Sequence, residues 1–259
     1  MNSFIPWVGG KSQLRKLISP KFPKQKPERY IEVFGGAGWM LFHKDNYAPL
    51  EVFNDIDGHL INLYRCVQYH CEELQREIRL GGEQLPPNSR EMFFDYKEQL
   101  NSRGLTDIQR AARYFYIIRI SYGANRREFA CNKKALTSAI DRLPEIQQRL
   151  KDVVIENRDF EDLIRVYDRP KALFYLDPPY FKAEQFYDGF AHDDHLRLYN
   201  RLTTLKGKFV LSYNDAPEIR KMYEHYNVFE LERSNSLSQR KCRIYKELII
   251  TNFHDEKVS

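Results

Sequence analysis

Short apolar runs recur along the chain, and segments with helical spacing of apolar residues lie between many of them. Runs rich in Val, Ile, Leu, Phe and Tyr are typical of buried β-strands. They predict strands at residues 30–35, 50–56, 153–157, 172–176, 208–213, 228–232 and 247–253. The intervening patterns predict helices at residues 12–18, 58–80, 161–166, 193–205 and 217–226.

This alternation of strands and helices predicts an α/β fold with a parallel sheet covered on both faces. The last two strands have no helical pattern between them, so we expect them to pair antiparallel at the edge of the sheet. The segment 234–246 would connect them.

One long stretch departs from the alternation, because residues 58–150 contain no convincing strand. Helical patterns at 91–100, 107–120 and 143–150 follow the first helix, with Gly81-Gly82 and Pro86-Pro87 between them. We interpret residues 58–150 as a helical domain inserted into a sheet domain made of residues 1–57 and 151–259.

Charge is unevenly distributed over the 259 residues, although the net charge is only +5. Residues 101–151 contain 11 Lys and Arg but 4 Asp and Glu, and residues 233–246 contain five basic residues and no acid. Two basic segments favour a polyanionic partner, and a solvated helix face is the plain alternative.

Composition excludes several protein classes. Hydrophobic residues make up 42% of the chain, enough for a globular core. No signal peptide and no apolar run near about 18 residues is present, so we expect no membrane association. The four cysteines form no C-x-x-C pair, and no tight Cys/His cluster indicates a metal site. We therefore expect a reduced, cytoplasmic protein without a metal ion. A monomer in solution fits the sequence, which does not determine the oligomeric state.

The most informative motif is Asp177-Pro178-Pro179-Tyr180, which ends the apolar run at 172–176. Two prolines cannot continue a central strand, so the chain must turn at the carboxyl edge of the sheet, where α/β folds bind ligands. The turn offers a carboxylate, a rigid carbonyl and an aromatic face, which suit a flat ring that carries an amino group. An ordinary strand-ending turn is the alternative interpretation.

A second motif, Phe34-Gly35-Gly36-Ala37-Gly38, follows the first strand, and Asp55 ends the next strand. A glycine turn followed by an acid about twenty residues later is typical of nucleoside binding, where the acid accepts bonds from ribose. An NAD-dependent oxidoreductase would fit this pair of features too. Gly9-Gly10-Lys11-Ser12 is not a phosphate loop, because Ile5 occupies the position of the first glycine.

Taken in order, these motifs resemble the Dam family (class D12) of DNA adenine-N6 methyltransferases. The resemblance begins at Trp7-Val8-Gly9-Gly10-Lys11, continues through the glycine turn, Asn54-Asp55-Ile56 and Asp177-Pro178-Pro179-Tyr180, and extends to residues 211–215, 233–236 and 246–252. It covers essentially the whole chain. It implies a Rossmann-like methyltransferase sheet that uses S-adenosyl-L-methionine and carries a helical target-recognition insertion.

The resemblance also implies which residues bind the cofactor and which act on the target base. The expected cofactor contacts are Trp7, Gly9, Gly10, Lys11, Phe34, Gly35, Gly36, Gly38, Asp55, Ile56, Asp159, Phe160 and Asp177. Asp177, Pro178, Pro179 and Tyr180 would be catalytic. The carboxylate and the Pro178 carbonyl would accept the N6–H bonds of an adenine flipped out of duplex DNA, and Tyr180 would stack on it.

The basic segments would then contact double-stranded DNA, which would associate the protein with the nucleoid. The expected contacts are Asn125, Arg126, Arg127, Arg233, Asn235, Ser236, Arg240 and Lys241. Arginine can read guanine or bind phosphate, and we expect phosphate contact from Arg126 and Arg127.

The sequence departs from GATC-methylating members of the family at two places. Pro6 replaces a lysine before the first motif, and Asn125-Arg126-Arg127-Glu128-Phe129 replaces an Asn-Gly-x-x-Arg stretch. GATC, a different short site and relaxed DNA specificity therefore stay open, as do action on RNA or protein and a non-catalytic DNA-binding role. A restriction–modification role, protection of a mobile element and gene regulation fit the same enzyme.

Overall fold

The chain folds into two compact units in the computed structural model, which describes residues 1–82, 84–130, 136–184, 189–234 and 244–254. The first unit comprises residues 1–11, 36–45 and 57–157, and the second comprises residues 12–35, 46–56 and 158–259. Residues 1–11 and 36–45 therefore cluster with the helical segment. The functional division into a recognition domain and a catalytic domain stays a prediction.

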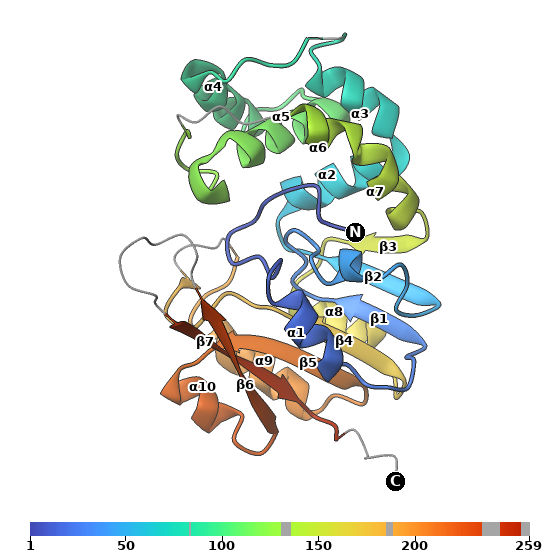
Figure 1. Cartoon of the computed structure of the whole chain (residues 1–259), viewed down its shortest axis with the longest axis vertical. Helices are drawn as coiled ribbons and strands as arrows, with labels where there is room; N and C mark the ends of the chain where they lie inside the picture. The colour runs from blue at the N-terminus through green and yellow to red at the C-terminus, as the bar shows by residue number, and fades with distance from the viewer. Residues whose placement is uncertain (83, 131–135, 185–188, 235–243, 255–259) are drawn as a thin grey trace. The chain divides into compact units, whose positions relative to one another are not determined.

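Seven strands form one sheet in the order β3-β2-β1-β4-β5-β7-β6 (Figure 1). Their bounds are β1 (Arg29–Glu32), β2 (Leu50–Asn54), β3 (Val153–Glu156), β4 (Ala172–Leu176), β5 (Lys208–Asn214), β6 (Asn227–Ser234) and β7 (Ile244–Thr251). Each predicted strand is present, and most differ from the prediction by a few residues at one or both ends. The mixed α/β fold is confirmed.

The central strands are parallel, because β1 pairs with β2 and β4, and β4 pairs with β5. β7 is antiparallel to both β5 and β6, which confirms the predicted antiparallel pair at the sheet edge. The connecting segment is shorter than predicted, because the strand pairing continues to Ser234 and Ile244. The sequence did not predict that β7 would lie between β5 and β6.

Helices cover both faces of the sheet in the second unit. Figure 1 shows α1 (Arg15–Ile18) in front of the central strands and α8 (Phe160–Tyr167) and α9 (Asp194–Thr203) behind them. α10 (Pro217–Met222) follows β5, and the short 3-10 helix η1 (Ser19–Lys21) follows α1. All five residues of β4 are buried, as expected for a strand covered on both sides.

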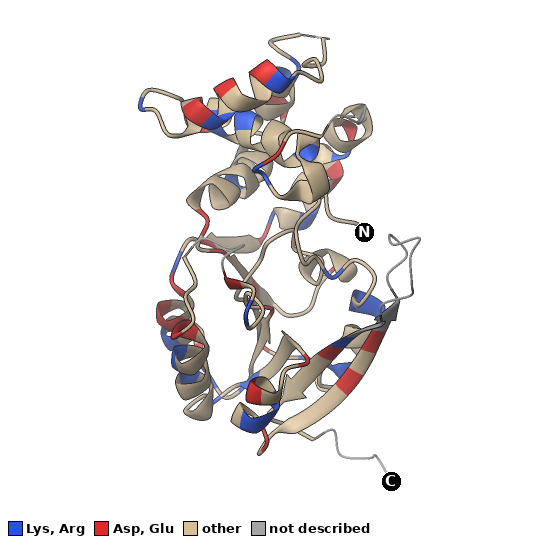
Figure 2. Cartoon of the chain, turned by 90° about the vertical axis from the view of Figure 1, so that its left-hand side faces the viewer, with Lys and Arg blue, Asp and Glu red and all other residues tan. Residues whose placement is uncertain are grey.

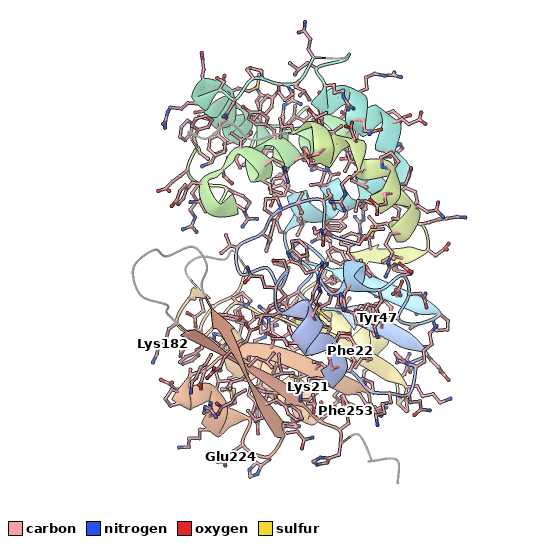
Figure 3. All side chains as sticks on the ribbon, in the orientation of Figure 1. Lys21, Phe22, Tyr47, Lys182, Glu224 and Phe253 are labelled. Atoms are coloured by element: carbon pink, nitrogen blue, oxygen red, sulfur yellow. The ribbon has the colours of Figure 1, made fainter. Side chains whose placement is uncertain are left out.

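The core of this unit is rich in aromatic rings. Tyr30 and Tyr47 stack with ring centroids 4.3 Å apart, and Phe22 lies 5.5 Å from Tyr47 and 6.0 Å from Tyr175. Phe22 and Tyr47 are labelled in Figure 3. Burial of one large apolar side chain stabilises a fold by roughly 1.5–3 kcal/mol. The rings of this cluster therefore stabilise the packing on one face of β1 and β4.

Apart from β3, the regular structure of the first unit is helical, as the sequence predicts for residues 58–150. It contains α2 (Gly58–Tyr69), α3 (Cys71–Ile78), α4 (Arg90–Leu100), α5 (Asp107–Ile120), α6 (Thr137–Asp141) and α7 (Leu143–Leu150), with the 3-10 helices η2 (Leu41–His43) and η3 (Tyr122–Ala124). α5 packs against α2, α3 and α4 and forms the centre of the unit. The sequence did not predict α6.

One helix boundary in this unit has a local sequence signal, and another does not. α5 begins at a capping box in which the Thr106 and Gln109 side chains bond each other's backbone N–H. The single helix predicted over residues 58–80 is instead two helices, because His70 adopts a non-helical backbone with φ −134° and ψ 41°. A hydrophobic pattern that continues across such a break gives no sign of it.

Candidate active site

Three loops follow the carboxyl ends of adjacent parallel strands of the second unit. The glycine turn follows β1, Asp55 follows β2, and Asp177 follows β4. β1 pairs with β2 on one side and β4 on the other, in parallel, so these three loops emerge at the same edge of the sheet. Asp55 and Asp177 are both partly exposed there.

Close packing between strand ends requires a glycine at position 35. The Gly35 N–H donates a hydrogen bond of 2.7 Å to the Asn54 carbonyl. A Cβ at this position would lie 2.3 Å from the Phe53 ring and 2.8 Å from the Asn54 oxygen. The glycine therefore allows β1 and β2 to continue side by side into their loops.

Asn54 joins three loops, a function that the sequence did not reveal. Its buried side chain donates to the Val33 carbonyl at 2.9 Å and to the Arg158 carbonyl at 3.1 Å. Its Oδ1 accepts a bond of 2.9 Å from the Arg158 N–H. Asn54 therefore fixes the backbone that carries the adjacent Asp55. Its place in the Asn54-Asp55-Ile56 motif, at the end of an apolar strand, was the only signal of this function.

Asp159 and Phe160 have structural partners of their own. Asp159 is the N-cap of α8, where its side chain accepts from the Glu161 N–H at 2.9 Å, and it forms an ion pair with Arg197 at 2.9 Å. Phe160 is buried, and its ring lies 5.7 Å from Phe34 and 5.9 Å from Phe190. The predicted cofactor contact of this pair stays a prediction.

Asn214 holds the loop that follows β4. Pro178 and Pro179 are buried, whereas Tyr180 is partly exposed. The Asn214 side chain accepts from the Phe181 N–H at 3.0 Å and donates to the Phe181 carbonyl at 3.2 Å. A side chain that pairs with both backbone groups of one residue fixes that residue like a strand partner. Sequence reasoning placed Asn214 in a motif but gave it no role.

Behind this loop lies a buried histidine, His195 of α9. Its Nδ1 is 2.6 Å from the Tyr213 hydroxyl and its Nε2 is 2.7 Å from Glu184. Burial lowers the pKa of His195, and burial also raises the pKa of Tyr213, which stays protonated. Both partners are satisfied by a neutral imidazole that donates from Nε2 to the carboxylate and accepts the tyrosine proton at Nδ1.

The shifted pKa values of His195 and Glu184 predict that the stability of the protein depends on pH. Burial raises the pKa of Glu184, but hydrogen bonds from its own and the Lys182 backbone and from His195 outweigh that effect and lower it to about 2. The lowered His195 pKa means that the unfolded chain binds a proton more readily, so stability declines as pH falls below about 6.5. The Glu184 contribution is lost only as pH falls from about 4.5 toward 2.

We expect the free energy of unfolding of the wild type to fall between pH 7 and pH 5.5 by more than that of His195→Gln, because glutamine does not titrate. One bound proton corresponds to a slope of at most about 1.4 kcal/mol per pH unit. Urea unfolding at four pH values measures both curves. Parallel curves for the two proteins would contradict the assignment of His195 as neutral.

Ile56 is exposed and lies in the second unit, whereas the remaining expected cofactor residues lie in the first unit. Gly36 and Gly38 have positive φ values of 50° and 65°, and a Cβ at Gly36 would lie 2.8 Å from the Trp7 ring. A Cβ at Gly10 would lie 2.6 Å from Trp39 Nε1. Lys11 is 3% exposed, and its Nζ donates to the Gly9 carbonyl at 3.2 Å. The N-terminal motif and Gly36 are therefore closely packed within the first unit.

The expected DNA contacts differ in their surroundings. Asn125 shapes a turn, because its Oδ1 accepts from the Arg127 and Glu128 N–H groups at 2.9 Å and 3.0 Å. Arg127 is exposed, whereas Arg126 forms an ion pair with Asp57 at 2.7 Å. Arg233 lies in β6, and Asn235, Ser236, Arg240 and Lys241 lie outside the described residues. Figure 2 shows Lys and Arg among Asp and Glu on the helices of the first unit.

Three further features concern other kinds of site. Within the described residues, no group of His, Cys, Asp and Glu could hold a metal ion. No helix there is long and apolar enough to span a membrane.

The first unit contains a groove of about 570 Å³. None of the site residues predicted from the sequence line it. Its lining residues are Gly58, His59, Asn62, Arg65, Cys66, Tyr69, His70, Asp107, Arg110 and Asn157.

Comparison with known proteins gives matches over most of the chain. The model of the family described as D12 class N6 adenine-specific DNA methyltransferase matches residues 7–237. The type II methyltransferase M.MjaIII of Methanocaldococcus jannaschii is 27% identical, over 96% of this chain and 98% of its own. The type II methyltransferase M.CviBI of Paramecium bursaria Chlorella virus NC1A is 22% identical, over 97% of this chain and 98% of its own. A DNA adenine methylase of Haemophilus influenzae is 23% identical, over 95% of this chain and 92% of its own.

Proposed function

The chain belongs to the D12 class N6 adenine-specific DNA methyltransferase family, and from that premise we propose how its residues methylate adenine. The chain is an adenine-specific DNA methyltransferase. The methyl donor we propose is S-adenosyl-L-methionine, which when bound supplies a methyl group activated by a positive sulfur. The single observation that supports the proposal most is the convergence of Asp55, Asp177 and the glycine turn at one edge of the sheet.

The residues at this edge fit a nucleoside-type donor. Asp55 is a partly exposed carboxylate that can accept hydrogen bonds from ribose hydroxyls. Asn54 fixes its backbone, and the glycine turn lets the main chain approach a ligand closely. We propose that five further residues of the second unit contact the donor: Phe34, Gly35, Ile56, Asp159 and Phe160. The donor contacts proposed for six residues of the first unit are supported by the resemblance of their motifs to those of the family: Trp7, Gly9, Gly10, Lys11, Gly36 and Gly38.

We propose that Asp177 and Pro178 prepare the amino group of the target adenine. Adenine N6 is a poor nucleophile because its lone pair is delocalised into the ring. The Asp177 carboxylate accepts one N6–H bond and the Pro178 carbonyl accepts the other, which favours a tetrahedral nitrogen whose lone pair points away from both. The carboxylate also stabilises the positive charge that develops on N6 and takes the proton that N6 must lose.

The loop that follows β4 also supplies a surface for the base. An adenine inside a duplex must leave the helix, at a cost of a few kcal/mol. Stacking on the partly exposed Tyr180 would offset about 1–3 kcal/mol of that cost. We propose that the exposed Arg127 and the basic segment 233–246 bind phosphates of double-stranded DNA, so activity should decline steeply with added salt.

The function is tested by incubating the purified protein with unmethylated genomic DNA and S-adenosyl-L-methionine, followed by long-read mapping of modified bases. N6-methyladenine at one short motif supports the proposal and identifies the target site. N6-methyladenine at scattered adenines supports it with relaxed specificity. Absence of methyladenine, in a preparation shown by calorimetry to bind the cofactor, would contradict the proposal. Methyl transfer to RNA under the same conditions would then identify RNA as the substrate in place of DNA.

Asn214→Ala is expected to lower kcat about 10- to 100-fold while KM for DNA changes little. The variant loses both bonds to Phe181, so the Pro178 carbonyl and Tyr180 are no longer held at the base. Single-turnover and steady-state methylation of a duplex substrate measure the effect. Asn214→Asp keeps the acceptor but loses the donor, and we expect an intermediate rate. A wild-type kcat in Asn214→Ala would show that this clamp does not position the loop.

A further inference from the structure

Arg126 lies in a tight loop that follows α5. Ser121 and Phe129 form an isolated antiparallel bridge, and the Tyr122 N–H donates to the Glu128 carbonyl at 2.8 Å. Within this loop Arg126 adopts a left-handed backbone with φ 59°. That conformation costs a non-glycine residue roughly 1–2 kcal/mol, so the surrounding contacts must hold it.

The guanidinium of Arg126 is held by two groups of the first unit, the partly exposed Asp57 and the buried Tyr114. Its Nη1 donates to Asp57 Oδ2 at 2.7 Å and to the Tyr114 hydroxyl at 2.6 Å. The Tyr114 hydroxyl in turn donates to the same Asp57 oxygen at 2.5 Å. Burial raises the pKa of Tyr114, which therefore stays protonated and able to donate. The three side chains form a closed triangle in which each polar contact supports the others.

The Arg126 guanidinium also covers Trp7 of the N-terminal motif. Its Cζ lies 4.4 Å from the centre of the Trp7 ring, within the range of a cation–π contact. Trp7 in turn contacts Gly36, where a Cβ would come within 2.8 Å of the ring. The indole therefore contacts both Arg126 of this loop and Gly36 of the glycine turn.

Asp57 connects the triangle to the helix that follows it. Its Oδ1 accepts from the His59 and Leu60 N–H groups at 3.0 Å and 3.1 Å and thereby caps α2. Its Oδ2 bonds Arg126 and Tyr114. One carboxylate thus divides its two oxygens between a helix cap and the loop. The arrangement requires arginine, because lysine has no planar face to lie on an indole while donating to two acceptors.

We propose that Arg126 is a positioning residue that fixes Trp7 for cofactor binding and so couples the cofactor site to the loop at residues 121–130. This inference rests on the proposed function, because Trp7 contacts the cofactor only if that function is right. It replaces the expectation that Arg126 contacts phosphate, since the guanidinium side chain is only 21% exposed. Binding of the cofactor against Trp7 would then favour one conformation of the loop, and DNA bound by the loop would favour the cofactor-binding position of Trp7.

Trp7 itself provides a readout, because the chain has only two tryptophans. In a Trp39→Phe background, fluorescence reports on Trp7 alone. We expect Arg126→Met to change the Trp7 emission of the free protein and to raise the Kd for S-adenosylhomocysteine at least about 10-fold. Arg126→Lys keeps the charge but loses the planar face, and we expect most of the same loss.

The matched control is Arg127→Met, which changes the adjacent, exposed arginine. We expect it to leave the Kd for S-adenosylhomocysteine within about twofold of wild type. We also expect the salt dependence of the DNA-binding constant to fall by the amount that corresponds to about one phosphate contact. Arg126→Met is expected to leave that salt dependence unchanged. Asp57→Asn keeps an acceptor for the α2 cap but loses the anionic partner of Arg126, so it should resemble Arg126→Met. Circular dichroism verifies that each variant is folded.

Two outcomes would overturn the inference. One is a wild-type Kd for S-adenosylhomocysteine in both Arg126→Met and Asp57→Asn. The other is a loss of DNA affinity in Arg126→Met with a reduced salt slope and an unchanged cofactor Kd, which would make Arg126 a phosphate contact. If the wild type itself does not bind S-adenosylhomocysteine, the proposed function fails at the cofactor, a result distinct from both.

Discussion

Asp177→Ala is expected to lower the rate of methyl transfer by at least about a thousandfold while the protein stays folded. Removal of one preorganised electrostatic partner of a transition state typically costs 10²–10³ in rate, and Asp177 would supply both an N6–H acceptor and a negative charge near N6. The side chain is partly exposed at the end of β4, so its truncation leaves no large cavity. Single-turnover transfer to a duplex substrate at saturating cofactor measures the chemical step.

Two further variants separate chemistry from structure in this experiment. Asp177→Asn keeps an acceptor oxygen but loses the charge, and we expect activity between that of wild type and Asp177→Ala. Asp152→Ala removes an exposed carboxylate in the turn before β3 and should keep wild-type activity. DNA affinity, measured by fluorescence anisotropy, should be unchanged in all three. Turnover by Asp177→Ala within tenfold of wild type would refute the proposed role of the carboxylate.

Gly35→Ala is expected to destabilise the protein by about 2–4 kcal/mol, the largest stability effect that we predict from a single methyl group. The added Cβ would overlap the Phe53 ring at 2.3 Å and the Asn54 carbonyl at 2.8 Å. Overpacking of a buried site typically costs 1–3 kcal/mol or more, and here the hydrogen bond between Gly35 and Asn54 prevents the strands from separating freely. Urea unfolding measures the free-energy change.

Gly82→Ala is the matched control for this substitution. Among the described residues other than its chain neighbours, no atom lies within 4 Å of a Cβ at Gly82, and its φ is not in the left-handed region. The expected change in stability is within about 0.5 kcal/mol of wild type. Equal unfolding midpoints for the two alanine variants would show that the strand ends can accommodate a side chain at position 35. Cofactor affinity should also fall in Gly35→Ala, because Asp55 follows Asn54 directly.

The sequence by itself determined the elements whose signals are local. α5 begins and ends as predicted because a capping box lies before it and its apolar face repeats with helical spacing. β4 was predicted residue for residue because two prolines end a continuous apolar run. The order of four motifs was enough to indicate the family and the proposed catalytic loop, since each motif is a short contiguous stretch.

Only the tertiary structure showed the contacts between residues far apart in sequence. The position of β7 between β5 and β6 is a choice among sheet orders that hydrophobic patterns do not distinguish. Asn54, Asn214 and His195 owe their roles to backbone groups or side chains brought together by folding. Arg126 illustrates the limit best. The sequence predicts a DNA contact for this basic residue of a basic segment. Its contacts with Asp57 and Trp7, 69 and 119 positions earlier, are visible only in the folded chain.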